Sequence, residues 1–343
     1  MAVTAGYDVG GAHLKVALAE GGRILAVQQI PCLLWQGVDR LDAAFAAAGP
    51  LIARADRHAA TMTGELCEIF PDRAIGVATL VDHLVALLGS NVRIWMGPHG
   101  LASPDAARGD PAAVASTNFL ASAEFLARRL GDALMVDFGS TTTDIIPIVA
   151  GRPCPRGLTD AERLATGELV YTGLTRTDVS TVAHGAVFQG RQQRLAAGRF
   201  ATMADVRRLT GELPQDLRGY ETADGRGTSP GECIARFSRC FGRDGADANA
   251  DDWRDAARGI ADQQLREIEA AIGEVLAATP VPQEAPLVAA GVGAPLIAPL
   301  AEKLGRPGRP FGDLIEAEPA CRLWATRCAP AVAVALLASA PIS

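Results

Sequence analysis

Short apolar runs recur along the chain, and each is bounded by glycine, proline or polar residues. The first three, at residues 3–9, 14–20 and 23–29, are joined by glycine-rich turns and predict an antiparallel meander of strands. Residues 134–137 and 143–149 predict a second hairpin, because two apolar segments flank a short polar turn. Further short strands are predicted at residues 59–63, 92–96 and 286–290.

Longer segments carry apolar residues at helical spacing. They predict helices at residues 39–55, 72–88, 111–129, 251–278, 294–304 and 329–340. Strands that alternate with helices indicate an α/β protein in which mixed sheets are flanked by helices. We place a domain boundary near Gly131, which gives an N-terminal domain at 1–130 and a C-terminal domain at 131–343. The last helix is expected either within the second domain or packed back on the first.

Composition excludes several classes of function. The 343 residues carry a net charge of −7, include no run of Lys or Arg and contain 5% aromatic residues, so no nucleic-acid partner is expected. The longest apolar stretch, 329–340, is shorter than the roughly 20 residues of a membrane span, and no secretory signal is evident. The seven cysteines form no CxxC pair, which argues against zinc. We expect a cytoplasmic protein without a membrane partner, and both monomer and homodimer stay open.

The strongest candidate for a ligand site is a turn that occurs twice. Its two copies read Asp8-Val-Gly10-Gly11-Ala12-His13-Leu-Lys15 and Asp137-Phe-Gly139-Ser140-Thr141-Thr142-Thr143-Asp144. Backbone amides and hydroxyl groups in such turns can surround a phosphate, and the aspartates can hold Mg²⁺ or another divalent cation beside it. Two facing half-sites of this kind predict a cleft for a nucleotide or a diphosphate. Taken alone, however, a DxGG turn is often a plain hairpin with permissive glycines, and Thr143 also suits a simple strand.

Two further segments are candidates for the same cleft. Gly291 and Gly293 lie between a strand and a helix, which directs free N–H groups toward a ligand, although close helix–strand packing explains the same glycines. Glu65 follows a strand and suits a general base or a metal partner, but an isolated glutamate is more often a solvated carboxylate.

The paired aspartate turns and the later GxG segment resemble the actin-like superfamily of sugar kinases, Hsp70 ATPases and hydantoinase/oxoprolinase proteins. Three segments narrow the resemblance: Thr61-Met-Thr-Gly-Glu-Leu66, Ala115-Ser-Thr-Asn-Phe-Leu-Ala-Ser-Ala123 and Val136-Asp-Phe-Gly-Ser-Thr-Thr-Thr-Asp-Ile145. They resemble the short hydantoinase-related proteins of tetrahydromethanopterin-linked one-carbon pathways. The resemblance implies two RNase H-like (actin-like ATPase) domains with a ligand cleft between them.

That family includes an enzyme of methanofuran biosynthesis, so the resemblance also implies an activity. An (aminomethylfuranyl)methyl diphosphate would condense with a tyramine- or tyrosine-type phenol to form an ether and release diphosphate. The implied catalytic residues are Lys15, Glu65 and Asp144, and the implied Mg²⁺ ligands are Asp8, Asp137 and Asp144. The implied ligand-binding residues are Gly10, Gly11, Ala12, His13, Gly139, Ser140, Thr141, Thr142, Gly291 and Gly293. The family's first loop usually carries Asn or Thr where His13 stands.

Two other classes of function remain. A small-molecule kinase or hydantoinase/oxoprolinase-type hydrolase of the same fold would use the turns for ATP and would bind the nucleotide through Gly291 and Gly293. A non-catalytic scaffold or regulator would keep the fold without turnover or a metal-dependent ligand. Nucleotide binding and turnover separate these alternatives from the diphosphate-using transferase.

Overall fold

The computed structural model describes residues 2–217 and 222–339. The chain forms two compact units: Met1–Asp137, Ile146–Thr166 and Thr279–Ser343 make up the first, and Phe138–Ile145 and Gly167–Ala278 make up the second. These units do not coincide with the predicted boundary near Gly131. The helix Asn118–Leu130 before that boundary and the strand Ala133–Phe138 after it contribute to one apolar core with the N-terminal part of the chain, and residues 131–137 belong to the first unit. The two predicted domains, 1–130 and 131–343, stay a prediction.

The first unit contains most of the strands and helices. Its strands are β1 (Val3–Val9), β2 (His13–Glu20), β3 (Arg23–Pro31), β4 (Arg57–Met62), β5 (Arg93–Trp95), β6 (Leu101–Ala102), β7 (Ala133–Phe138), β9 (Arg152–Pro153), β13 (Leu287–Ala290), β14 (Gly308–Pro310) and β15 (Glu316–Ala317). Its α-helices are α1 (Asp39–Ala47), α2 (Gly49–Ile52), α3 (Arg73–Leu88), α4 (Pro104–Gly109), α5 (Pro111–Val114), α6 (Asn118–Leu130), α7 (Asp160–Thr166), α12 (Ala294–Lys303), α13 (Pro319–Arg327) and α14 (Ala329–Ser339). Its 3-10 helices are η1 (Leu34–Gln36), η2 (Gly64–Leu66), η3 (Gly97–His99) and η5 (Phe311–Leu314).

The first sheet has the strand order β15-β3-β2-β1-β4-β5-β6. Strands β1, β2 and β3 are antiparallel neighbours, and β4 and β5 run parallel to β1, so the predicted meander is confirmed. Gly21 and Gly22 form the turn between β2 and β3 with φ of 57° and 83°, a region that glycine adopts without steric cost. This arrangement is the one expected of an RNase H-like domain.

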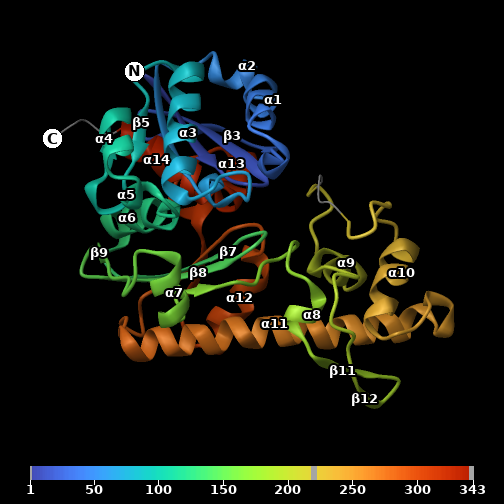
Figure 1. The fold of residues 1–343 in the computed structure, drawn as a ribbon. Helices are drawn as coiled ribbons and strands as arrows, with labels where there is room; N and C mark the ends of the chain where they lie inside the picture. Colours follow the sequence, from blue (N-terminus) through green and yellow to red (C-terminus); the bar gives the residue numbers. More distant parts are fainter. Residues whose placement is uncertain (1, 218–221, 340–343) are drawn as a thin grey trace. The chain divides into compact units, whose positions relative to one another are not determined.

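Two apolar cores cover the two faces of this sheet. Tyr7 and Val9 of β1 belong to the core that contains α1 and α3, whereas the opposite face packs against α14, which in turn contacts α6 (Figure 1). Gly6 allows α14 to lie close to β1, since a Cβ there would lie 2.2 Å from the carbonyl oxygen of Ala331. Helix α14 is apolar all round because it is buried on nearly all sides.

The C-terminal segments complete the first unit. Strand β13 runs parallel to both β7 and β14, and all four of its residues are buried, which explains its continuous apolar run. The predicted last helix corresponds to α14, and its predicted end, Ala340, lies outside the described residues. Within residues 2–217 and 222–339 no single helix is long and apolar enough to cross a membrane. The pair α13 and α14, bent by 109°, meets that test by length and composition only.

The second unit is built on one long helix. Its elements are β10 (Leu169–Val170), β11 (Gly185–Phe188), β12 (Arg191–Arg194), α8 (Val179–Val182), α9 (Met203–Leu209), α10 (Pro230–Cys240), η4 (Gly245–Asp247) and α11 (Ala250–Ala278), while β8 (Thr143–Val149) begins here and ends in the first unit. The hairpin β11–β12 and helices α9 and α10 pack against α11 (Figure 1). Phe188, Phe237, Phe241 and Trp253 form their aromatic core, with ring centroids 4.6–6.3 Å apart.

The predicted α/β class, with sheets flanked by helices, is confirmed, but two predicted helices are interrupted. Residues 39–55 divide into α1 and α2 at Gly49 and Pro50, where proline cannot continue the preceding helix. Residues 111–129 divide into α5 and α6 because Ser116 has a φ of 55°, which ends helical geometry. This break matters for the site described next.

Candidate functional site

A row of polar side chains crosses the first sheet at the end of β1. Asp8 is paired in register with Lys15 of β2 on one side and with Thr61 of β4 on the other. Nζ of Lys15 donates to Oδ2 of Asp8 at 2.9 Å. The other carboxylate oxygen, Oδ1, and the hydroxyl of Thr61 are buried and have no hydrogen-bond partner among the described residues. Two unsatisfied buried oxygens beside an ion pair indicate a place where a ligand completes the bonding.

The electrostatics of this row involve two residues from distant parts of the chain. Burial disfavours the charge of Lys15, but attraction to Asp8 and Asp137 contributes to an opposite effect that outweighs burial and raises the pKa of the ammonium above its ordinary value. Cys328 immediately precedes α14, and burial raises the pKa of its thiol to about 12, so it is a neutral group. Asp8, Lys15 and Asp137, all predicted site residues, are therefore electrostatic neighbours within the first unit.

The two predicted ligand turns share one backbone geometry. The amide of Gly10 donates to the carbonyl of His13 at 3.0 Å, and the amide of Gly139 donates to the carbonyl of Thr142 at 2.9 Å. These bonds correct the expectation that both amides point at a phosphate, because each is used to close its own hairpin. A Cβ at Gly10 or Gly139 would lie 3.1 Å from the same carbonyl, so close approach, rather than a positive φ, favours glycine at both positions.

The remaining residues of the first turn lie at its edge. Ala12 and His13 are buried, and a Cβ at Gly11 would lie 2.8 Å from the sulfur of Cys67.

The second turn, Ser140–Thr142, and Asp144 belong to the second unit, where Asp144 pairs with Leu169 of β10. The hydroxyl of Thr143 donates to the carbonyl of Thr172 at 2.8 Å, so Thr143 is a buried strand residue, as its alternative interpretation held.

A segment that the sequence did not single out supports the second turn. The amides of Leu174 and Arg176 donate to the carbonyls of Gly139 and Ser140 at 2.9 Å each. A Cβ at Gly173 would lie 2.4 Å from the amide nitrogen of Thr141, so this segment lies directly against the turn. Gln264 of α11 donates to the carbonyl of Gly173 at 2.8 Å, which fixes the segment to the long helix.

Glu65 is buried in a separate group of polar contacts. It lies in η2, directly after β4, and only 1% of its surface is exposed, which corrects the alternative of a solvated carboxylate. Oε1 accepts hydrogen bonds from the amide of Ser116 at 2.8 Å and from its hydroxyl at 3.1 Å. The Ser116 hydroxyl also lies 3.3 Å from Asp160, which is paired with Arg73 at 2.9 Å. Oε2 of Glu65 is buried without a hydrogen-bond partner among the described residues.

This environment changes the protonation of Glu65. Burial raises the pKa of its carboxyl to about 7, and the hydrogen bonds from Ser116 only partly offset that effect. A carboxyl group with a pKa close to neutrality can accept or donate a proton under ordinary conditions, which an exposed glutamate does poorly. The raised pKa therefore suits Glu65 to proton transfer.

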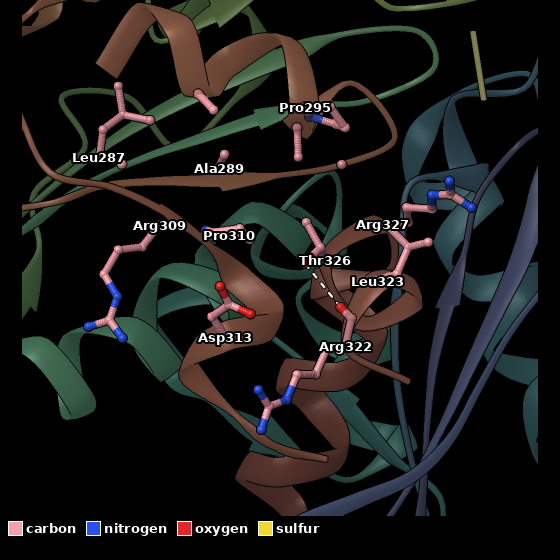
Figure 2. Close-up of a pocket in the computed structure, with 14 residues that line it drawn as sticks. Leu287, Ala289, Pro295, Arg309, Pro310, Asp313, Arg322, Leu323, Thr326 and Arg327 are labelled. Carbon is pink, nitrogen blue, oxygen red and sulfur yellow. Dashed lines mark hydrogen bonds between the residues drawn. The ribbon is translucent and has the colours of Figure 1, made fainter. Parts of the chain in front are cut away.

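The GxG segment differs from its prediction. Gly291 has a φ of 82°, and its amide donates to the carbonyl of Thr326 at 2.8 Å, so this N–H is not free for a ligand. Gly293 is the N-cap residue of α12. A pocket of about 400 Å³ nevertheless opens beside Gly291, between β13, β14, α12 and α13 (Figure 2).

The structure gathers fewer candidate metal ligands in one place than the sequence predicted. Within residues 2–217 and 222–339 no group of three or more His, Cys, Asp or Glu side chains is placed to hold a metal ion. Asp8 and Asp137 belong to the first unit and Asp144 to the second. The unsatisfied Oδ1 of Asp8 does fit a cation or a water bound to one. Mg²⁺ often uses one or two carboxylates plus phosphate oxygens and water, so a magnesium site at Asp8 and Asp137 stays a prediction.

Sequence reasoning missed several contributors. Cys328, Asp160 and the 172–176 segment belong to no motif in the sequence. Residues 115–119 read as a polar helix start with Ser116 or Thr117 near the N-cap; Thr117 takes that position without a capping side-chain bond, and Ser116 binds Glu65 instead. The positive φ of Ser116 has no signature in the sequence that could have revealed this contact.

Comparison with known proteins agrees with the resemblance inferred above. The hydantoinase/oxoprolinase family profile matches residues 56–309. A protein of Methanocaldococcus jannaschii named (4-(4-(2-(γ-L-glutamylamino)ethyl)phenoxymethyl)furan-2-yl)methanamine synthase is 29% identical over 68% of this chain and 70% of its own length. A protein of the same name from Methanococcus vannielii is 31% identical over 38% of this chain and 59% of its own length.

A solved structure shares the fold. The nucleotide-free structure of acetone carboxylase aligns with a TM-score of 0.59 and 12% identity, covering 98% of this chain and 70% of that chain. At this identity the likeness concerns the fold alone. It agrees with the predicted α/β class of sheets flanked by helices.

Proposed function

The chain belongs to the hydantoinase/oxoprolinase family, and on that premise we propose that it is a transferase of methanofuran-type cofactor biosynthesis. It would condense an (aminomethylfuranyl)methyl diphosphate with a phenol, form an aryl ether and release diphosphate, in support of tetrahydromethanopterin-linked one-carbon metabolism. The names of both relatives support this proposal, because the product they describe contains a phenoxymethyl-furan linkage. The observation that carries it is the Lys15–Asp8 pair beside Asp137 at the end of β1.

The main requirement of this reaction is that the enzyme stabilises the diphosphate leaving group. The furan ring stabilises positive charge on the methylene carbon as the carbon–oxygen bond to diphosphate breaks, so the enzyme must chiefly stabilise the departing anion. The Lys15 ammonium is held in its charged form by Asp8 and Asp137, and its side chain is 25% exposed, so it remains accessible to a ligand. Ser140, Thr141, Thr142 and Asp144 of the second turn stay predicted contributors, and so does His13 of the first.

A divalent cation fits the same place in this proposal. Asp8, through its unsatisfied Oδ1, and Asp137 would hold it. Bound there, Mg²⁺ would supply positive charge to the diphosphate oxygens. ATP is a ligand only under the kinase or hydrolase alternative.

Glu65 is the proposed general base. A phenol has a pKa of about 10, so its attack on the methylene carbon is faster when a base removes the proton. The phenolic oxygen forms the new bond to carbon, its proton passes to the carboxylate of Glu65, and the bonding pair of the old bond leaves with diphosphate. A pKa near 7 suits this role, because the base is ionised near neutral pH and still binds a proton well.

³¹P NMR of the purified protein with Mg²⁺ tests the proposal. One sample contains the furanylmethyl diphosphate with γ-glutamyltyramine or tyrosine, a second omits the phenol, and a third contains ATP alone. We expect diphosphate release that requires the phenol, together with an aryl ether detected by mass spectrometry. ATP cleavage with the furan diphosphate unchanged would assign the protein to the kinase or hydrolase class. No turnover in any sample would favour the scaffold alternative.

A further inference from the structure

The pocket beside Gly291 has apolar walls and a volume suited to a small organic ligand. Its apolar lining residues include Leu287 and Ala289 of β13, Pro295 and Ala298 of α12, and Leu323 of α13. Its volume of about 400 Å³ lies within the range of about 300–1,000 Å³ that ligand pockets span. Such walls favour a flat or aliphatic body rather than a free diphosphate.

Charged side chains lie at one mouth of this pocket. Figure 2 shows Arg309 of β14, Asp313 of η5 and Arg322 of α13 on the same side, away from Arg327 and Pro295. Nε of Arg322 donates to the carbonyl of Ala317 in β15 at 3.3 Å, which limits the movement of this side chain. Two guanidinium groups and one carboxylate can bind a carboxylate and an ammonium on the same ligand.

The opposite end of the pocket adjoins the aspartate row. Ala290, which precedes the lining residue Gly291, pairs in register with Asp137. Arg327, another lining residue, precedes Cys328, whose thiol responds to Lys15, Asp8 and Asp137. One end of a ligand in the pocket therefore lies toward the proposed diphosphate site, while the other end lies at the charged mouth.

We propose that this pocket binds the phenolic co-substrate by an α-amino carboxylate. Arg309 and Arg322 would bind the carboxylate, Asp313 the ammonium and the apolar walls the ring, so that the phenol is directed toward Asp137. This inference rests on the proposed function. It is consistent with the γ-L-glutamyl group in the relatives' names, because a γ-glutamyl amide ends in an α-amino carboxylate.

The competing ligand is an adenine nucleotide, since GxG segments can hold one. Asp313 argues against it, because a carboxylate at the mouth would repel the phosphates while it attracts an ammonium. The bonded amide of Gly291 removes one N–H that a nucleotide would use. The zwitterionic ligand therefore fits both the charge and the shape of the pocket.

Direct binding tests the pocket without requiring turnover. Isothermal titration of the whole protein with tyrosine, γ-glutamyltyramine, tyramine and a non-hydrolysable ATP analogue compares ligands with and without the α-amino carboxylate. We expect tyrosine or γ-glutamyltyramine to bind at least about tenfold more tightly than tyramine. Arg309→Gln and Asp313→Asn should each weaken that ligand about 10- to 100-fold and leave tyramine unchanged. Arg129→Gln, an exposed change in α6, is the matched control.

The outcomes separate this inference from the proposed function. Equal binding of tyramine and the amino-acid phenols, or insensitivity to both pocket variants, would overturn the inference even if diphosphate release occurs. Binding of the ATP analogue that Arg309→Gln abolishes would identify a nucleotide pocket instead. Selective binding of the amino-acid phenol without diphosphate release would uphold the pocket and reject the transferase reaction.

Discussion

The amide of Ser116 donates a hydrogen bond to Oε1 of Glu65 at 2.8 Å, across 51 positions of sequence. Ser116 adopts a φ of 55°, unusual for a residue with a side chain, and this conformation breaks the helix that the local sequence favours. The same contact holds a buried carboxyl whose other oxygen is unsatisfied among the described residues. A strained backbone beside an ionisable group with a raised pKa is typical of a functional site.

The raised pKa of Glu65 predicts how stability depends on pH. The folded protein binds this proton more tightly than the unfolded chain, so stability is highest below about pH 4.5 with respect to this group and falls as pH rises through about 7. A shift from 4.5 to about 7 corresponds to about 3 kcal/mol. We expect Glu65→Gln to increase the free energy of unfolding at pH 8 relative to the native chain, and the gain to shrink toward pH 5. Urea denaturation at both pH values measures it, and an equal effect at both would contradict the assignment.

The Glu65 carboxyl also predicts that activity rises with pH, whereas its contribution to stability falls. A general base acts when it is deprotonated, so kcat/KM should rise with pH through about 7 and level off above it. Glu65→Gln should lower kcat by about 100-fold or more and abolish that rise. A pH–rate profile of both proteins is the measurement. If the variant keeps the native profile, the ionisation belongs to another residue.

Asp8 and Lys15 form the proposed anion site. Asp8→Asn removes the charge that holds the Lys15 ammonium and a proposed cation ligand, so we expect kcat to fall by about 100- to 1,000-fold. Circular dichroism should show an intact fold, since asparagine has nearly the same size. Asp82→Asn is the matched control, because that carboxylate is 65% exposed and paired with Arg108 on the surface. Near-native turnover of Asp8→Asn would remove this residue from the site.

Gly6 controls the packing of α14 on β1. A Cβ at Gly6 would lie 2.2 Å from the carbonyl of Ala331 and 2.6 Å from the amide of Ala335, so the helix would have to move. We expect Gly6→Ala to lower the free energy of unfolding by about 3 kcal/mol or more. Gly109→Ala in the same unit should change it by less than about 1 kcal/mol, since a Cβ there meets nothing within 4 Å. Similar stabilities for the two variants would show that α14 does not pack as described.

A buried ion pair joins helices α9 and α10 of the second unit. Arg236 of α10 is fully buried and its Nη2 lies 2.7 Å from Oδ1 of Asp205 in α9, while Asp224 binds its Nη1 at 2.9 Å. Arg236→Met leaves the Asp205 charge buried without its partner, so we expect a loss of about 3–5 kcal/mol in the free energy of unfolding. Adding Asp205→Leu should restore part of that loss, which a double-mutant cycle in urea measures. Additive losses would argue against direct coupling.

The sequence by itself determined the local structure and the nature of the repeated turns. Apolar runs with Gly21 and Gly22 between them predicted the positions of the strands in the meander. They could do so because strand periodicity and turn chemistry depend on residues that are neighbours in sequence. The two aspartate turns also share one backbone geometry, because the amides of Gly10 and Gly139 close equivalent hairpins. Helix α11 followed from its regular apolar spacing.

Only the tertiary structure decided which of these groups meet. Nothing local to Glu65 indicates that Ser116 will bury it, and nothing local to Cys328 indicates that Lys15 lies near it. The charged mouth formed by Arg309, Asp313 and Arg322 likewise draws on a strand, a 3-10 helix and an α-helix. Periodicity records which face of an element is buried, whereas the partner on that face depends on how the whole chain packs, and so do the pKa values and pockets that follow from it.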